Sequence, residues 1–142
     1  MNVTYLENCV QSLEAAYTCL KDAQPGTLQY DICRTAVIKE FEFSIETTGK
    51  LLRRYLKTQE DNPKKATKLN FKDVIRSAGY YEFFDIPTME RWLIYRDNRN
   101  RIAHDYGKDF AEKTLILIPP FLQDAKALIS LLKDKLVDLP DA

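Results

Sequence analysis

The sequence has little of the residue types that build metal centres, disulfide frameworks and tight turns. It holds one histidine, three cysteines, four glycines and six prolines in 142 residues. The cysteines are Cys9, Cys19 and Cys33, and neither their odd number nor their spacing suits a disulfide framework or a zinc site. We expect reduced, buried thiols in a cytoplasmic protein that binds no metal and no cofactor. With so few turn residues, the regular elements must be long.

A long hydrophobic run is also missing. The longest aliphatic stretch, Leu115 to Ile118, stops at Pro119-Pro120, whereas a membrane-spanning helix needs about 20 apolar residues. The N-terminus has no basic region followed by an apolar segment, so we expect no signal peptide. These absences predict a protein that has no membrane segment.

An excess of charge of one sign is absent as well, because 21 Lys and Arg balance 21 Asp and Glu. This balance argues against a general nucleic-acid coat but leaves room for a local basic site. Residues 50–68 hold seven Lys and Arg against two Asp and Glu. Such a segment is most often a solvated helix end and loop, and it is alternatively a docking surface for RNA or for an acidic partner.

What the sequence does contain is helical periodicity, with apolar residues recurring at spacings of three and four. It predicts a helix over residues 3–20, a turn at Pro25-Gly26, and a long helix over residues 30–58 that Gly49 weakens locally. Residues 64–68 are then interpreted as a loop.

In the second half of the chain, Asn70 is expected to cap a short helix that ends near residue 78. Gly79 is expected to end that helix in the left-handed backbone conformation. A helix opened by Pro87 and Thr88 should run to residues 103–105. The final helical region, residues 109–136, should be kinked or split by its two adjacent prolines.

No strand-like alternation of useful length interrupts these patterns, so the core must form by packing of helix against helix. Length alone suggests one domain. We therefore predict a single all-α domain over residues 1–142, built as an up-and-down bundle of four or five helices.

The helix over residues 89–106 separates its side chains into two arcs at about 100° per residue. The apolar arc, which we expect to face the core, carries Trp92, Ile94, Tyr95, Ile102 and Tyr106.

The polar arc of the same helix carries Arg96, Asp97, Asn100 and His104, with Arg99 at its border. Asn100 and His104 stack one turn apart, but Arg99 and His104 point about 140° away from each other. One copy of the helix therefore brings Arg99 and His104 together poorly. Two copies related by a two-fold axis would place both pairs around one cleft, which predicts a dimer formed through this helix.

These residue types suit phosphate chemistry. An imidazole exchanges a proton near neutral pH, a guanidinium binds a phosphate and the charge that develops on it, and Asn100 can orient either group. No metal cage is visible, which favours metal-independent RNA cleavage with the 2′-hydroxyl of the RNA as nucleophile. The alternative is structural: His104 caps the last carbonyls of its helix, and the charged arc is only solvated.

The motif itself resembles a known one. Arg99-Asn100-x-x-x-His104 is similar to the R-x4-6-H motif of HEPN domains. Asp105-Tyr106 extends it to R-x4-H-x-Y, the form found in the toxins of HEPN–MNT toxin–antitoxin pairs.

Other segments extend the resemblance to nearly the whole chain. Residues 41–46, Phe-Glu-Phe-Ser-Ile-Glu, with Lys50 and Tyr55-Leu56 behind them, resemble a pattern of the nucleotidyltransferase substrate-binding family. Residues 73–79, ahead of Trp92, resemble it too. One departure is that Thr48-Gly49 stands where a tryptophan is expected, which should affect packing more than chemistry.

This resemblance implies a HEPN-like bundle that dimerises through the motif-bearing face, with Arg99 and His104 as the RNase residues and Asn100 in support. It also implies a cognate minimal nucleotidyltransferase that acts as antitoxin by transferring AMP to Tyr106. A nucleotidyl group there would add negative charge and bulk at the phosphate site. Tyr106 is alternatively a core aromatic, and its ring could pack while its hydroxyl stays exposed.

Four further residues are candidates for supporting roles: Arg96, Asp97, Glu46 and Lys50. Glu46 and Lys50 are four apart on one helix, which slightly favours a surface ion pair. The alternative is that Glu46 is a carboxylate that orients His104 or Arg99.

Three functional hypotheses follow. The first is an endoribonuclease toxin, active as a homodimer and silenced by a partner nucleotidyltransferase. The second is a non-catalytic subunit that presents a substrate to that same partner. The third is a plain helical dimer whose Arg/His face only holds the subunits together.

Overall fold

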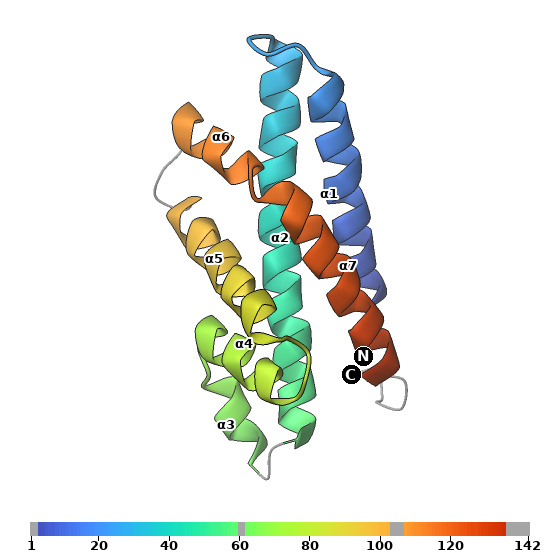
Figure 1. Ribbon diagram of the computed structural model, residues 1–142, viewed down its shortest axis with the longest axis vertical. Helices are drawn as coiled ribbons and strands as arrows, with labels where there is room; N and C mark the ends of the chain where they lie inside the picture. Colours follow the sequence, from blue (N-terminus) through green and yellow to red (C-terminus); the bar gives the residue numbers. More distant parts are fainter. Residues whose placement is uncertain (1–2, 60–61, 103–106, 136–142) are drawn as a thin grey trace.

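The computed structural model describes residues 3–59, 62–102 and 107–135, and every regular element in these ranges is a helix. The helices are α1 (Thr4–Asp22), α2 (Leu28–Gln59), α3 (Pro63–Thr67), α4 (Phe71–Tyr80), α5 (Ile86–Ile102), α6 (Lys108–Leu115) and α7 (Ile118–Lys135). The long helices α1, α2, α5 and α7 form the bundle, and the shorter ones cover its ends (Figure 1). The prediction of an all-α fold is confirmed.

Helix α2 is the element on which the others assemble. It is 32 residues long and runs the length of the molecule, with α1 on one side and α3, α4 and α5 on the other (Figure 1). Its predicted span of residues 30–58 agrees closely with the observed one. Gly49 does not interrupt it, because packing on both sides of the helix outweighs the weak helix propensity of glycine.

The core is organised by four large aromatic side chains from three helices: Phe41 of α2, Trp92 and Tyr95 of α5, and Phe121 of α7. All four are fully or almost fully buried. The ring centroid of Phe121 lies 4.9 Å from that of Phe41, 5.1 Å from Tyr95 and 5.3 Å from Trp92, in edge-to-face arrangements. Such contacts add to the hydrophobic gain of burial, and they fix α5 against α2 and α7.

One member of the predicted apolar arc does not face this core. Ile94 is 53% exposed, whereas Trp92 and Tyr95 are buried. On an ideal helix Ile94 lies about 100° from Tyr95 and about 160° from Trp92, so a single buried face cannot include all three. The prediction for Ile94 is wrong. The side chain of Ile102 and the whole of Tyr106 lie outside the described residues.

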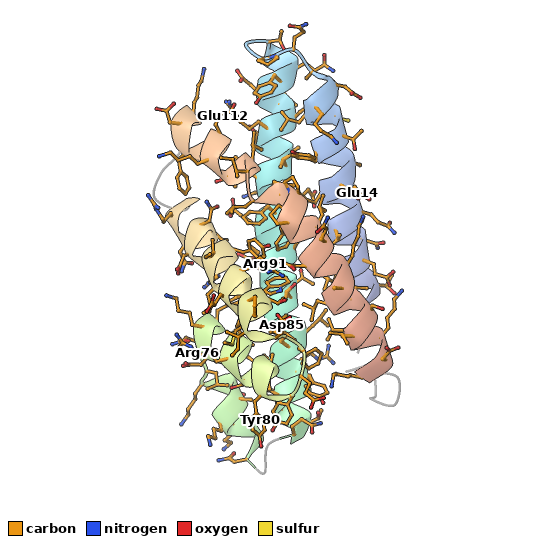
Figure 2. The ribbon with its side chains drawn as sticks, viewed as in Figure 1. Glu14, Arg76, Tyr80, Asp85, Arg91 and Glu112 are labelled. Carbon is orange, nitrogen blue, oxygen red and sulfur yellow. The ribbon has the colours of Figure 1, made fainter. Side chains whose placement is uncertain are left out.

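A buried carboxylate joins α5 to α7. Asp124 of α7 is only 8% exposed. It accepts hydrogen bonds from the Tyr95 hydroxyl at 2.5 Å and from Nε and Nη2 of Arg91 at 2.8 and 2.9 Å (Arg91 is labelled in Figure 2). Burial, and then the bond to Asp124, raise the pKa of Tyr95 well above its usual range. The carboxylate is therefore fully engaged, as a buried charge must be.

The structure corrects some of the predictions made for the residues that follow α2. Residues 64–68, interpreted above as a loop, lie almost entirely within α3, because the Asn62 side chain caps the Lys64 N–H at 3.1 Å and Pro63 suits the first helical position. Asn70 caps α4 as predicted. Gly79, however, lies inside α4, and the residue with a left-handed backbone is Glu82, with φ of 68°.

The starts of the last helices follow capping chemistry. Asp85 accepts a hydrogen bond from the Thr88 N–H at 2.8 Å at the start of α5, and bonds from Thr88 lower the pKa of that carboxyl. The C-terminal region is split into α6 and α7, and the chain bends by 49° between these two helices. The break precedes Pro119-Pro120, which occupy the first turn of α7, where a missing N–H costs little.

Among the described residues, no single helix is long and apolar enough to cross a membrane. The bent pair of α6 and α7, taken together, is long and apolar enough by length and composition alone.

Replacing Tyr95 by Phe should destabilise the fold by about 1.5–3 kcal/mol, because it removes a buried hydrogen bond to a charged acceptor while keeping the ring. Urea unfolding would report this as a lower midpoint at unchanged slope. Tyr80→Phe is the matched control, since Tyr80 is 82% exposed, and its midpoint should equal that of the parent. Equal midpoints for both variants would contradict the role given to the Tyr95 hydroxyl.

Candidate functional site

The structure describes the first half of the Arg99–Tyr106 motif. Arg99 and Asn100 lie in the last turn of α5, which ends at Ile102. The predicted site residues His104 and Tyr106, together with Asp105, lie outside the described residues. The described part of the site is therefore the arginine end of the motif, together with the elements that hold it.

Arg99 forms an ion pair with Glu46, which lies 53 positions earlier on α2. The Arg99 side chain is only 23% exposed, so the carboxylate offsets much of the cost of partly burying the guanidinium. Among the described residues, the ion pair of Glu46 is with Arg99 and not with Lys50, whose side chain is exposed. Of the two interpretations of Glu46 given above, this contact favours a carboxylate that orients Arg99.

Two further arginines lie next to this pair. The Arg96 guanidinium sits 4.9 Å from the centre of the Phe71 ring, in the geometry of a cation–π contact. Nη2 of Arg53 donates to the Leu69 carbonyl at 2.7 Å. Burial, and then the charges of Arg99 and Arg53, lower the pKa of Arg96.

Arg53, Arg96 and Arg99 are called the arginine cluster below. They come from α2 and α5 and meet where these helices pack beside α4, with Glu46 as a carboxylate among them. Nε of Arg53 and Nε of Arg99 are buried and have no acceptor within the described part of the chain. Among the described residues, the carboxylates that act on Arg96 are Glu46 and Asp97, and Asp97 is paired with Lys72. The three guanidinium groups therefore keep an excess of positive charge, which favours binding of a phosphate or another oxyanion.

A glycine makes this junction possible. A Cβ atom on Gly49 would lie 2.9 Å from two ring atoms of Phe71, closer than carbon atoms can approach. Gly49 thus lets Phe71 reach the surface of α2, where its ring supports Arg96. The absence of a tryptophan at this point of the sequence has a packing consequence, because the Phe71 ring takes up the space beside Gly49.

The other predicted residues point elsewhere. Asp97 forms an ion pair with Lys72 of α4 at 3.2 Å between exposed side chains, so it ties α5 to α4 and does not join the Glu46–Arg99 pair. Asn100 is exposed on the last turn of α5. Its position is compatible with contact to a bound molecule.

Sequence reasoning missed two contacts that hold α5 to α6 across residues 103–106. The Thr114 hydroxyl donates to Oδ1 of Asn98 at 3.1 Å, and the Arg101 guanidinium lies 5.1 Å from the Phe110 ring centre. Both contacts fix the helix ends on either side of the second half of the motif.

Arg53 and Phe71 were also missed. Arg53 lies seven positions after Glu46 and therefore on the same face of α2, so helical periodicity could have indicated it. Phe71 had no such signal, because its place depends on how α4 folds back on α2.

Comparison with known families identifies the class of protein. The family described as "nucleotidyltransferase substrate binding protein like" matches residues 1–134, and the chain belongs to it. The "probable ribonuclease HepT" of Haemophilus influenzae is 29% identical over 140 residues, which cover 95% of this chain and 94% of that protein.

A solved structure from Haemophilus influenzae, described as the fold of a substrate binding domain of a nucleotidyltransferase, superposes on this one with a TM-score of 0.83. The two are 28% identical, and the match covers 93% of this chain and 99% of the other. The family resemblance seen in the sequence is thereby confirmed, and so is the helical fold that it implies.

Replacing Gly49 by Ala should lower the free energy of unfolding by roughly 1–3 kcal/mol, because the new methyl group must displace an aromatic ring packed between helices. Gly79→Ala is the control. Its Cβ would meet Sδ of Met89 at 3.2 Å, and that flexible side chain can move, so the gain in helix propensity should leave stability equal or higher. Thermal or urea unfolding distinguishes the two variants, and equal stability of both would contradict the close approach of Phe71.

Proposed function

We propose that the protein is a metal-independent endoribonuclease of the HepT type, in which Arg99 binds the phosphate to be cleaved and His104 transfers protons, with Asn100 in support. The observation that carries this proposal is the Glu46–Arg99 ion pair, which holds the motif arginine beside two further arginines. The relative named "probable ribonuclease HepT", which matches nearly the whole chain, supports the same reaction.

The reaction needs no group beyond the protein and the RNA. The 2′-hydroxyl oxygen attacks the neighbouring phosphorus and gives its proton to one His104 imidazole. The bond from phosphorus to the 5′-oxygen breaks, and that oxygen takes a proton from a second, protonated imidazole. The products are a 2′,3′-cyclic phosphate and a 5′-hydroxyl. Arg99 stabilises the negative charge that builds on the phosphate oxygens in the transition state.

A homodimer is part of the proposal. The helical offset between Arg99 and His104, about 140°, separates them on one copy. A two-fold arrangement of α5 and the segment after it would supply two imidazoles and two guanidinium groups to one cleft. Asp97 and Arg96 lie on the same helix and would border that cleft.

We further propose that this protein is the toxin of a toxin–antitoxin pair and that a cognate minimal nucleotidyltransferase silences it. The membership in a family described by nucleotidyltransferase substrate binding supports such a partner. In the modification step the Tyr106 oxygen attacks the α-phosphorus of ATP, pyrophosphate leaves, and the phenolic proton is lost. The resulting AMP group would place a negative phosphate two residues from His104 and repel the RNA.

The second candidate function is a non-catalytic subunit that presents a substrate to that nucleotidyltransferase. Both the family description and the solved relative, which is described as a substrate binding domain, favour it. The arginine cluster would then hold an anionic group of the presented substrate.

His104→Ala should lower cleavage of a labelled RNA in the presence of EDTA by about 10²–10⁴-fold, because proton transfer is lost. Size-exclusion chromatography should show the same dimer for variant and parent. Absence of cleavage by parent protein whose Tyr106 is unmodified by mass spectrometry would overturn the ribonuclease proposal in favour of the presenting subunit.

Glu46→Gln tests the positioning of Arg99. The loss of the ion pair should lower kcat for RNA cleavage by about 10–100-fold, the order of effect expected when a phosphate-binding group is misplaced by about 1 Å. Glu90→Gln is the control, since it makes the same change at an exposed carboxylate of α5, and its kcat should equal that of the parent. A loss of stability in Glu46→Gln with unchanged kcat would assign Glu46 a structural role only.

A further inference from the structure

A second basic region lies beside the arginine cluster. It consists of five lysines of α2, α3 and the residue after α3, which we call the lysine surface: Lys50, Lys57, Lys64, Lys65 and Lys68. The three lysines at α3 are exposed, because Ala66 is the residue of that helix that turns inward and is buried. Lys50 and Lys57 are seven positions apart and therefore share one face of α2.

Among the residues that the structure describes, the lysines of this surface have no carboxylate partner. The described parts of the segment, residues 50–59 and 62–68, contain seven Lys and Arg and no Asp or Glu. None of the five lysines forms an ion pair with a residue that the structure describes. Some cations elsewhere do have a carboxylate partner, as in Lys133 with Glu7 at 3.0 Å and Arg34 with Glu112 at 3.0 Å. The zero net charge of the chain thus conceals a local excess at one end of the bundle.

Arg53 connects the lysine surface to the arginine cluster. Its guanidinium donates to the carbonyl of Leu69, one residue after Lys68, and its charge acts on Arg96. Along α2, the distance from Glu46 to Lys57 is about 16 Å at 1.5 Å per residue. A nucleic-acid strand rises about 3.4 Å per nucleotide when stacked, so this distance matches roughly five phosphates.

The composition of this region favours a polyanion over a protein as its ligand. Protein interfaces are enriched in exposed aromatic and aliphatic side chains and depleted in lysine. The large apolar side chains that are exposed include Phe43 and Tyr80, and between these two the described chain has none. Tyr80, at the C-terminal end of α4, lies at the same end of the molecule as α3 (Figure 2). A surface in which lysines outnumber exposed apolar side chains favours the phosphate backbone of a nucleic acid.

We propose that the lysine surface binds the phosphate backbone of the substrate RNA and guides one strand into the arginine cluster. The inference rests on the proposed ribonuclease function for the identity of the nucleic acid. It assigns the surface a role in affinity without sequence preference, since lysine contacts to phosphates carry no base information.

The test measures binding apart from cleavage. The ligand is a fluorescein-labelled, single-stranded 2′-O-methyl RNA, which lacks the attacking hydroxyl and stays intact. Its affinity for the parent, for the triple variant Lys64→Gln/Lys65→Gln/Lys68→Gln, and for the control triple Lys21→Gln/Lys39→Gln/Lys113→Gln is measured by anisotropy at several salt concentrations. The control removes the same charge from exposed lysines of α1, α2 and α6. Unfolding midpoints establish that both variants are folded.

The α3 triple variant should lower the slope of log affinity against log salt by about 2, because each single-strand phosphate contact contributes about 0.7. It should weaken binding at low salt by at least tenfold, and the control should match the parent. Equal binding by all three proteins, or no binding by the parent, would overturn the proposal. So would an unchanged RNA affinity combined with lost binding to the partner nucleotidyltransferase, which would assign the surface to a protein.

Failure of the proposed function gives a different result. If the parent does not cleave natural RNA but its binding of the 2′-O-methyl RNA still depends on the α3 lysines, the surface is an RNA site of a non-catalytic protein. If cleavage is present and the α3 triple variant raises KM without lowering kcat, the lysine surface supplies ground-state affinity only, as proposed.

Discussion

The packing of Trp92 and Tyr95 of α5 against Phe41 and Phe121 determines where the rest of the molecule can lie. These rings leave α5 one possible rotation about its own axis, because turning it would expose the largest side chains of the core. Asp124 adds a directional constraint, since its hydrogen bonds from Tyr95 and Arg91 require both side chains on the α7 side.

That rotation decides the role of the arginines. Arg99 lies two turns after Trp92, displaced by about 20° around the helix axis, and therefore points toward α2. A guanidinium in this position needs a compensating charge, and Glu46 supplies it. Arg96 lies one turn after Trp92 and is half-buried beside Phe71. The core and the candidate site therefore use the same face of α5. Trp92 lies in its buried centre, and Arg96 and Arg99 lie at its edge.

Much of the fold was predictable because its signals are local. The periodicity of α1 and α2, the capping of α4 by Asn70 and the split of the C-terminal region can all be derived from neighbouring residues in the sequence. The errors arose where one local rule competed with another. The five-residue α3 is too short for periodicity and depends on its Asn62 cap, and Ile94 is apolar yet lies opposite the rings that form the core.

The sequence by itself determined the family, the all-α class, the motif arginine and the basic segment, because each of these is a matter of residue types at fixed spacing. Only the tertiary structure decided the partner of Glu46, the presence of Arg53 beside Arg96, and the need for Gly49 under Phe71. These contacts join residues from separate helices. Spacing along one helix fixes which face a side chain occupies, but the packing of whole helices fixes what that face meets.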